Sequence, residues 1–239
     1  MFKGLRKSVT EKANEQLGKA RLAAQRKQFK EASSFAEQAI EILKGEEDRR
    51  KLDLARALYY EYLGNLSIKE NKALESANYL GRSGGFYLRL SMDSELQRVH
   101  EKQAKILLVI ARQVMKEKKF VEAASFFERA AMSFQRIGNT AEELDCKAKS
   151  YISRAAAEKT ISGRKGFLKK AVELIGEKGS DEPIIQAHLA YYNGLFIEDE
   201  KTELALKYYT VALQNYQLSG AVGRVEEIKK KINRLTKLL

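Results

Sequence analysis

A glycine that recurs at a fixed interval is the feature that most constrains the fold. Gly138, Gly179 and Gly220 lie 41 residues apart, and each follows an apolar helical segment. Residues typical of helix starts follow these glycines, as in 139–142 and 180–183. A period of this length indicates stacked helix pairs, because one pair cannot bury its apolar face alone. The sequence therefore predicts an array of helical hairpins.

The composition favours helix along the whole chain. It has one proline, no tryptophan and a hydrophobic fraction of 44%, which suits a packed helical protein. A single cysteine excludes an intramolecular disulfide. The apolar run 106–111 is far too short to span a membrane, and residues 1–9 lack the apolar stretch of a secretion signal. We expect a cytoplasmic protein without a membrane partner.

Five hairpins can be phased by one position near the start of each second helix. The position is small in four of the five, and its members are Ala32, Ala73, Ala123, Arg164 and Ala205. The intervals are 41, 50, 41 and 41 residues, so we expect an insertion around residues 81–85 in the second interval, as a flexible loop between repeats. Whether the longer segment 81–93 is ordered is left open. Apolar residues continue at helical steps within the second helices, as in Ala123, Phe127, Ala130 and Phe134. Capping boxes are predicted at Ser94 with Gln97 and at Thr140 with Glu143.

The last predicted helix, 224–239, belongs to no hairpin. Its apolar residues step by three and four: Val225, Ile228, Ile232, Leu235 and Leu239. Such a helix caps the open end of a helical array, but the same spacing suits a seam between two copies of the chain. We expect one domain over 1–239, in which 1–9 is a basic N-terminus and 221–239 a capping or dimerisation helix.

The hairpin sequences resemble a known family. Residues 119–130, KFVEAASFFERA, resemble the second helix of a tetratricopeptide repeat (TPR), and 29–39 and 202–212 repeat the pattern more weakly. The period exceeds the usual ~34 residues, which is more similar to the long TPR-like repeats of SNAP-type vesicle-fusion adaptors. The resemblance implies an all-α, right-handed α-solenoid of about five hairpins with a C-terminal capping helix. It also implies binding of peptides or proteins on the concave face formed by first helices.

The sequence offers little for catalysis. His100 and His188 lie on different predicted hairpins, and Cys146 has no partner cysteine, so no metal site is expected. We interpret both histidines as ordinary packed or surface residues and Cys146 as a small buried filler. No phosphate-binding loop or nucleophile–base pair is evident. We expect no enzyme activity, no cofactor and no small-molecule substrate.

Positive charge gathers at the two ends of the chain. The net charge is +12; residues 1–30 hold nine basic residues against two acidic ones, and 221–239 hold six against two. This distribution suits an anionic partner, and our preferred hypothesis is a non-catalytic adaptor on a ribonucleoprotein such as a ribosomal subunit. The candidate binding residues are Lys3, Arg6, Lys7, Lys12, Arg26, Lys27, Lys30, Lys229, Lys230, Lys231 and Arg234.

Two alternatives remain open. In the first, a TPR-like groove holds an acidic peptide or protein tail, with Lys105, Arg112 and Lys116 as candidate contacts. In the second, the chain is a regulatory or assembly protein that acts as a homodimer through 224–239. Neighbouring aromatics such as Tyr59 and Tyr60, or Tyr191 and Tyr192, cannot all face one core, because adjacent residues of a helix point about 100° apart. Some of them are therefore expected at a surface or in a groove.

Overall fold

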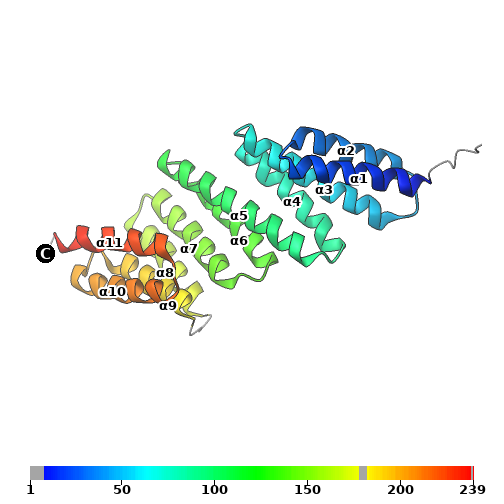
Figure 1. The fold of residues 1–239 in the computed structure, drawn as a ribbon. Helices are drawn as coiled ribbons and strands as arrows, with labels where there is room; N and C mark the ends of the chain where they lie inside the picture. Colours follow the sequence, from blue (N-terminus) through cyan, green and yellow to red (C-terminus); the bar gives the residue numbers. More distant parts are fainter. Residues whose placement is uncertain (1–7, 178–181, 238) are drawn as a thin grey trace, which may run out of the picture. The chain divides into compact units, whose positions relative to one another are not determined.

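The structure, a computed structural model, describes residues 8–177, 182–237 and 239, and within them it contains eleven helices and no strand (Figure 1). The helices are α1 (Val9–Gln25), α2 (Phe29–Leu43), α3 (Arg49–Lys69), α4 (Ala73–Arg89), α5 (Asp93–Lys116), α6 (Phe120–Arg136), α7 (Thr140–Ala157), α8 (Ile161–Gly176), α9 (Pro183–Ile197), α10 (Thr202–Leu218) and α11 (Val222–Thr236).

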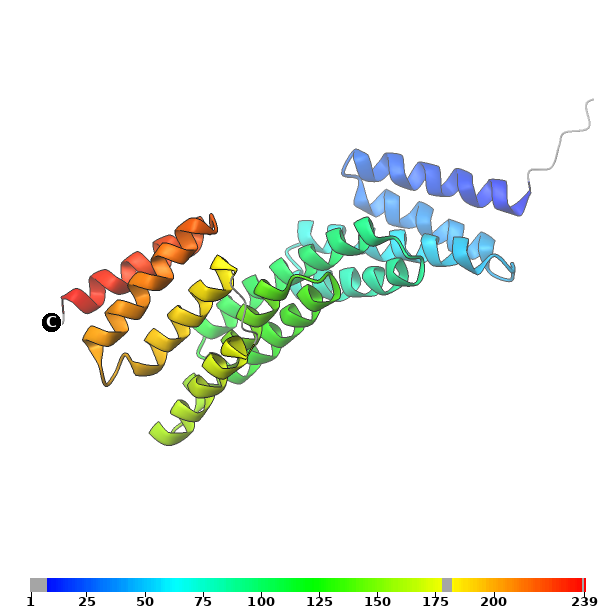
Figure 2. The same cartoon turned by 90° about the horizontal axis from the view of Figure 1, so that it is seen from below.

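The chain divides into two compact units. The first comprises 1–110 and 136–138, and the second comprises 111–135 and 139–239, so α5 and α6 contribute to both. Helices pack mainly on their neighbours in sequence, α1 to α4 in the first unit and α7 to α11 in the second. Figure 2 shows the antiparallel course of α1 to α4 (blue to cyan) and of α9 to α11 (yellow to red). The expected all-α array of helical hairpins is therefore present; its right-handed sense and its single-domain character stay predictions.

Most of the described helices end in a turn in which one residue has backbone angles in the left-handed region. Gly138 and Gly220 have φ of +69° and +70°, whereas the corresponding turns elsewhere use Lys27, Asn71, Ser91 and Lys118, with φ of 56–61°. The next backbone N–H bonds back to the carbonyl five residues earlier, as from Ala221 to Tyr216 at 3.0 Å. This is the Schellman arrangement, which satisfies carbonyls at the end of a helix. Gly179 lies outside the described residues.

The predicted loop around 81–85 is wrong. Helix α4 continues through Arg89, and α5 begins at Asp93 after a three-residue turn. Gly81 and Gly84 serve a different purpose, because side chains of α5 fill the space where their Cβ atoms would stand. A Cβ on Gly84 would lie 2.5 Å from Nε2 of His100, and one on Gly81 would collide with Nε2 of Gln103. These glycines let two helices approach closely.

The phasing of the second hairpin also needs correction. Ala73 is the first residue of α4, and the buried small residue at the fourth position of that helix is Ser76. The equivalent positions are thus 32, 76, 123, 164 and 205, with intervals of 44, 47, 41 and 41. The added residues lie in the first helices, since α3 has 21 residues and α5 has 24, against 18 in α7. Longer helices, not an insertion, lengthen the repeat.

The two predicted capping boxes are wrong as well. Ser94 is the second residue of α5, and Thr140 is the first residue of α7, whose cap is Asn139. The Asn139 side chain accepts from the backbone N–H of Glu142 at 3.2 Å. A complete capping box is found instead at α1, where Ser8 and Glu11 each accept the other's backbone N–H. The position just before each helix governs capping, and a shift of one residue changes the assignment.

The predicted apolar stripes of the second helices form the cores. In the first unit Ala32, Ala36 and Ala39 of α2 are fully buried against α1 and α3. In the second unit the stripe of α10 is buried against α9 and α11: Ala205, Tyr209, Ala212 and Tyr216. Alanines allow close helix approach and aromatics fill the remaining volume. The stripe of α6 is buried in the same way.

The last helix, α11, packs on α10 within the second unit. Ile228 and Leu235 are buried in the core with Tyr216, Val225 and Ile232 are partly buried there, and Leu239 is 67% exposed. This packing supports the capping interpretation for four of the five apolar residues. Their use as a dimer seam stays a prediction. None of the described helices combines the length and apolarity needed to cross a bilayer.

Candidate functional site

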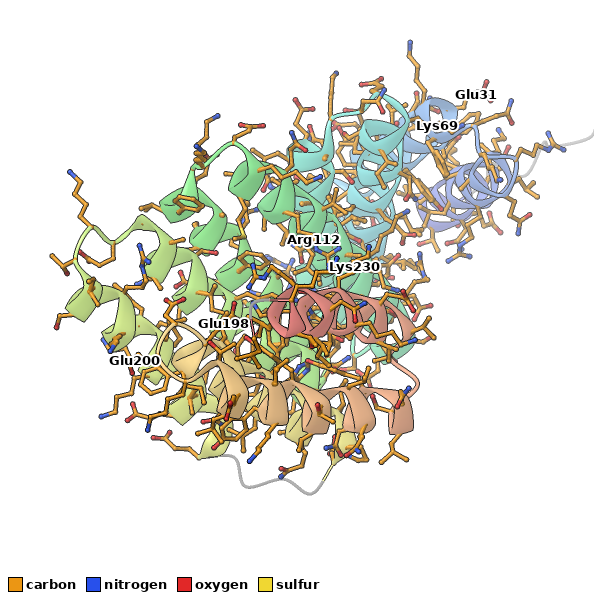
Figure 3. All side chains as sticks on the ribbon, turned by 90° about the vertical axis from the view of Figure 1, so that its left-hand side faces the viewer. Glu31, Lys69, Arg112, Glu198, Glu200 and Lys230 are labelled. Carbon is orange, nitrogen blue, oxygen red and sulfur yellow. The ribbon has the colours of Figure 1, made fainter. Side chains whose placement is uncertain are left out.

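The second unit contains a cavity of about 410 Å³. Most of its lining comes from α5, α7 and α9, which are first helices of successive hairpins, and from the capping helix α11. Its walls comprise Arg112, Met115, Phe127, Lys149, Ile152, Tyr191, Tyr192, Leu195, Arg224 and Glu227. Figure 3 shows Arg112 on α5 and Lys230 on α11. The first helices are where the family resemblance places a binding groove.

The cavity has apolar walls with two tyrosines among them. Met115, Ile152 and Leu195 provide aliphatic surface. The ring of Tyr191 is half-buried and packs edge-on against Tyr192, with centroids 5.1 Å apart, whereas Tyr192 is buried. Successive tyrosines on α9 therefore occupy different environments, as the helical geometry predicts. Tyr191 offers a partly open aromatic surface to a ligand.

A buried carboxylate holds three residues of the cavity wall. Asp145 on α7 is 1% exposed. Its Oδ2 accepts from Nζ of Lys149 at 2.5 Å and from the guanidinium of Arg224 on α11, and its Oδ1 accepts from the Tyr192 hydroxyl at 2.8 Å. His188 Nδ1 lies 3.7 Å from the same carboxylate and 2.6 Å from the Tyr216 hydroxyl. The network ties α7, α9, α10 and α11 together.

The charges within the network determine its protonation. Burial alone would raise the pKa of Asp145, but Lys149 and Arg224 outweigh burial, so this pKa lies well below its usual range. Burial lowers the pKa of His188 to about 4, and the nearby Asp145 carboxylate only partly opposes this. Burial, followed by the charge of Asp145, raises the pKa of Tyr192 well above its usual value. At neutral pH the site therefore holds an ionised aspartate and a neutral histidine.

Arg112 differs from the other two cations of the cavity wall. Lys149 and Arg224 are engaged by Asp145, and Arg224 also contacts Glu227 at 3.2 Å. Arg112 is exposed and forms no hydrogen bond or ion pair with any residue in the described part of the chain. The charge of Arg112 acts on Glu142 and partly opposes the raised pKa of that carboxyl. Because no hydrogen bond or close ion pair holds its guanidinium among the described residues, Arg112 can bind a carboxylate of a ligand.

The three predicted groove residues divide between the two units. Arg112 lines the cavity, whereas Lys116 is exposed one turn further along α5 and does not line it. Lys105 lies in the first unit and pairs with Glu101 at 2.5 Å. The prediction that these residues contact a groove-bound ligand stays a prediction, and the structure supports it best for Arg112.

The predicted basic ends differ in how available they are. Lys3, Arg6 and Lys7 lie outside the described residues. Exposed positions on α1 and α2, or between them, hold Lys12, Arg26, Lys27 and Lys30. On α11, Lys229 lies 3.5 Å from Glu226 and Lys230 is exposed, whereas Lys231 and Arg234 both pair with Glu198. The basic C-terminal patch is therefore partly neutralised by its own unit.

Both histidines and the cysteine are packed residues. His100 and His188 are fully buried, and the structure contains no cluster of metal-binding side chains among the described residues. Cys146 is buried as predicted, and burial raises the pKa of its thiol to about 12. Asp145 is not among the residues predicted from the sequence, although the sequence holds a signal for it. An aspartate between Leu144 and Cys146, both on the buried face, is a buried charge that needs partners.

Comparisons with known proteins gave structural likeness only. No family model matches the chain, and no curated protein matches it. Solved structures with likeness include the nearly identical TPR-like repeats of a protein assigned as a kinesin light chain from Podospora anserina. A variant of those repeats with one substitution has 14% identity and a TM-score of 0.34 over 96% of this chain and 97% of that one. A second structure of these repeats has 13% identity and a TM-score of 0.32 over 97% of each chain. The helix pairs of the present chain carry the fold assignment.

Proposed function

We propose that the protein is a non-catalytic interaction module that holds a peptide segment of a partner protein in the cavity of the second unit. One observation carries the proposal: three successive first helices and the capping helix enclose apolar walls that include the exposed Arg112, which forms no close ion pair with a described residue. A pocket with mainly apolar walls and few polar groups is the usual form of a ligand site.

The residues of the cavity wall indicate which side chains the bound peptide segment carries. An aliphatic or aromatic side chain would bury against Met115, Ile152 and Leu195, at about 25 cal/mol per Å² of apolar surface removed from water. A neighbouring carboxylate would pair with Arg112. The Asp145 network holds α7, α9 and α11 in place, so the cavity is formed before the ligand arrives. The segment is thus an acidic peptide with one apolar anchor.

The arrangement gives the buried histidine a structural role. His188 contacts Tyr216 and Asp145 inside the unit and is not part of the cavity wall. A catalytic base must reach a reacting atom, and His188 is enclosed by protein. We therefore keep the absence of catalysis, and a cytoplasmic protein partner, within the proposal.

Peptide display against the full chain, followed by calorimetry of the selected peptides, tests the proposal. We expect acidic peptides with one large apolar residue, and at least tenfold weaker binding to Arg112→Glu. Lys116→Glu is the matched control, since it makes the same charge change on the same helix outside the cavity. Equal loss in both variants would indicate non-specific charge, and selected peptides that bind Arg112→Glu normally would refute the site.

Docking on a ribonucleoprotein is the second candidate. The exposed cations on and between α1 and α2 favour it: Lys12, Arg26, Lys27 and Lys30. Phosphate contacts would make the binding steeply salt-dependent. Recovery of the tagged protein from native lysate at low salt, with and without ribonuclease, tests this candidate. Co-purifying ribosomal proteins that are lost on either treatment would support it, and one stoichiometric protein that survives both would favour the peptide groove.

A further inference from the structure

The hairpin of α3 and α4 in the first unit carries a row of stacked aromatic rings. Tyr60 lies between Tyr79 and Phe86, with ring centroids 6.2 and 5.8 Å away and planes inclined by 22° and 14°. All three rings are only partly buried. Aromatic rings that serve only a hydrophobic core are fully buried. These stacked rings are half-exposed, so they form a surface on which flat groups can stack.

Arginines lie on and between these rings. The guanidinium of Arg82 lies 5.5 Å from the ring centroid of Tyr60, and those of Arg89 and Arg56 lie 4.3 and 6.0 Å from that of Phe86. Asp53 is the one carboxylate that pairs with this set among the described residues, and it contacts Arg89 at 3.0 Å and Arg56 at 3.7 Å. Arg82 forms no ion pair within the same part of the chain.

The row of cations continues to the start of α3. Arg49 and Arg50 line an open cleft of about 600 Å³ together with Asp53, Arg89, Leu90 and Ser91. The first turn of α3 contains no acidic residue. Cations at the start of a helix oppose the helix dipole, so these arginines are unfavourable for the helix itself. From Arg49 to Tyr60 the helix rises about 17 Å. We define the aromatic–arginine stripe as Tyr60, Tyr79, Phe86, Arg49, Arg50, Arg56, Arg82 and Arg89.

We propose that the aromatic–arginine stripe binds single-stranded nucleic acid, with bases stacking on the rings and phosphates pairing with the arginines. An acidic protein segment would use the cations, but it would make no use of the exposed parts of the three aligned rings. A nucleic-acid strand repeats a flat base and a phosphate along its length, which matches rings and guanidinium groups that alternate along one hairpin. The stripe is separate from the peptide cavity and from the basic ends.

Fluorescence anisotropy of the full chain with a short labelled oligouridylate tests the proposal over a range of salt concentrations. In the variant Arg50→Gln/Arg82→Gln we expect about tenfold weaker binding. The slope of log affinity against log salt should fall by about 1.4, because two phosphate contacts on a single strand are lost. Tyr60→Leu should bind about tenfold more weakly with an unchanged slope, since it removes stacking and no charge.

Three controls make the result decisive. Lys44→Gln removes an exposed cation outside the stripe and should leave binding unchanged, as should Lys169→Gln in the second unit. Circular dichroism melts show that each variant is folded, and the exposed arginines allow a test even where Tyr60→Leu does not fold. Absence of binding to the wild type at low salt, unchanged affinity in the arginine variant, or loss only in Lys44→Gln would overturn the proposal. Equally tight binding of polyglutamate would assign the stripe to an acidic protein.

Discussion

The guanidinium of Arg224 on α11 donates to the buried carboxylate of Asp145 on α7, across 79 positions of the sequence. The capping helix is therefore held by charge as well as by its apolar face. We expect Arg224→Met to lower the free energy of unfolding of the second unit by about 3 kcal/mol, because it removes one of the two cations that pair with a buried carboxylate. Urea denaturation followed by circular dichroism measures this change.

A double-mutant cycle separates this pair from the loss of packing. In Asp145→Leu/Arg224→Met both charges are gone, so the combined loss should be smaller than the sum of the single losses by more than about 1 kcal/mol. The exposed pair of Lys105 and Glu101 is the control, and Glu101→Gln should change stability by less than about 0.5 kcal/mol. Additive losses at Asp145 and Arg224 would show that the pair contributes no coupling.

The second unit should lose stability on mild acidification. The pKa of His188 is about 4 in the fold, against an ordinary value of 6.5, so the unfolded chain binds more protons between these values. The stability from the neutral histidine is complete above about pH 6.5 and is lost as the pH falls to about 4, by on the order of 2–3 kcal/mol. Urea midpoints measured from pH 7 to pH 4 should show this decline.

His188→Gln is the variant that checks the source of the pH dependence. It keeps a polar group near Tyr216 and Asp145 but cannot titrate, so the decline between pH 6.5 and 4 should flatten. Burial also lowers the pKa of His100 in the first unit, and His100→Gln measures its separate share. An unchanged decline in both variants would mean that carboxylates, not histidines, control acid stability.

Alanine substitutions at two adjacent glycines of α4 should change the stability of the protein in opposite directions. A Cβ on Gly84 would stand 2.5 Å from Nε2 of His100, whose ring is held by Gln103 at 2.9 Å, so Gly84→Ala should cost about 2 kcal/mol through overpacking. A Cβ on Gly85 meets nothing within 4 Å. Gly85→Ala should stabilise α4 by up to about 1 kcal/mol. Thermal unfolding of both variants compares them directly, and equal effects would contradict the close approach of α5.

The helix-closing turns allow a matched pair of substitutions. Lys118, just after α5, has φ of +61°, and Gly138, at the equivalent position just after α6, has φ of +69°. Side chains other than glycine cost about 1 kcal/mol in this region. Lys118→Gly should therefore stabilise the protein by roughly 0.5–1 kcal/mol, and Gly138→Ala should destabilise it by about 1 kcal/mol. Urea midpoints that move in the same direction would show that backbone strain does not control these turns.

Local patterns of the sequence predict most of the fold. The alanine stripe of α2 and the alanine–tyrosine stripe of α10 follow from helical periodicity, which depends only on residues within each helix. The second hairpin departs from the local pattern for a physical reason. Gly81 and Gly84 read as loop residues, but they lie within α4 because His100 and Gln103 of the next helix need their space. Contacts with a neighbouring helix cannot be predicted from the local sequence pattern.

The candidate site was less predictable for the same reason. Arg112 was selected from its charge on a first helix, whereas the cavity depends on side chains from α5, α7, α9 and α11. Asp145 finds its partners at three other positions spread over 79 residues. Spacing within one helix cannot show such a network, although a carboxylate on a buried face indicates that one must exist.

Removal of α11 distinguishes a cap from a dimer seam. The helix covers Tyr216 in the core and supplies Arg224 to Asp145, so a chain ending before Val222 exposes an apolar face and loses one of the two cations paired with a buried carboxylate. We expect this truncated protein to aggregate or to lose cooperative unfolding of the second unit. The double variant Lys229→Gln/Lys230→Gln, which changes only outward-facing cations of α11, should stay folded. Light scattering of both proteins provides the measurement: a folded monomer after truncation, beside a dimeric full chain, would assign α11 to a seam between two copies.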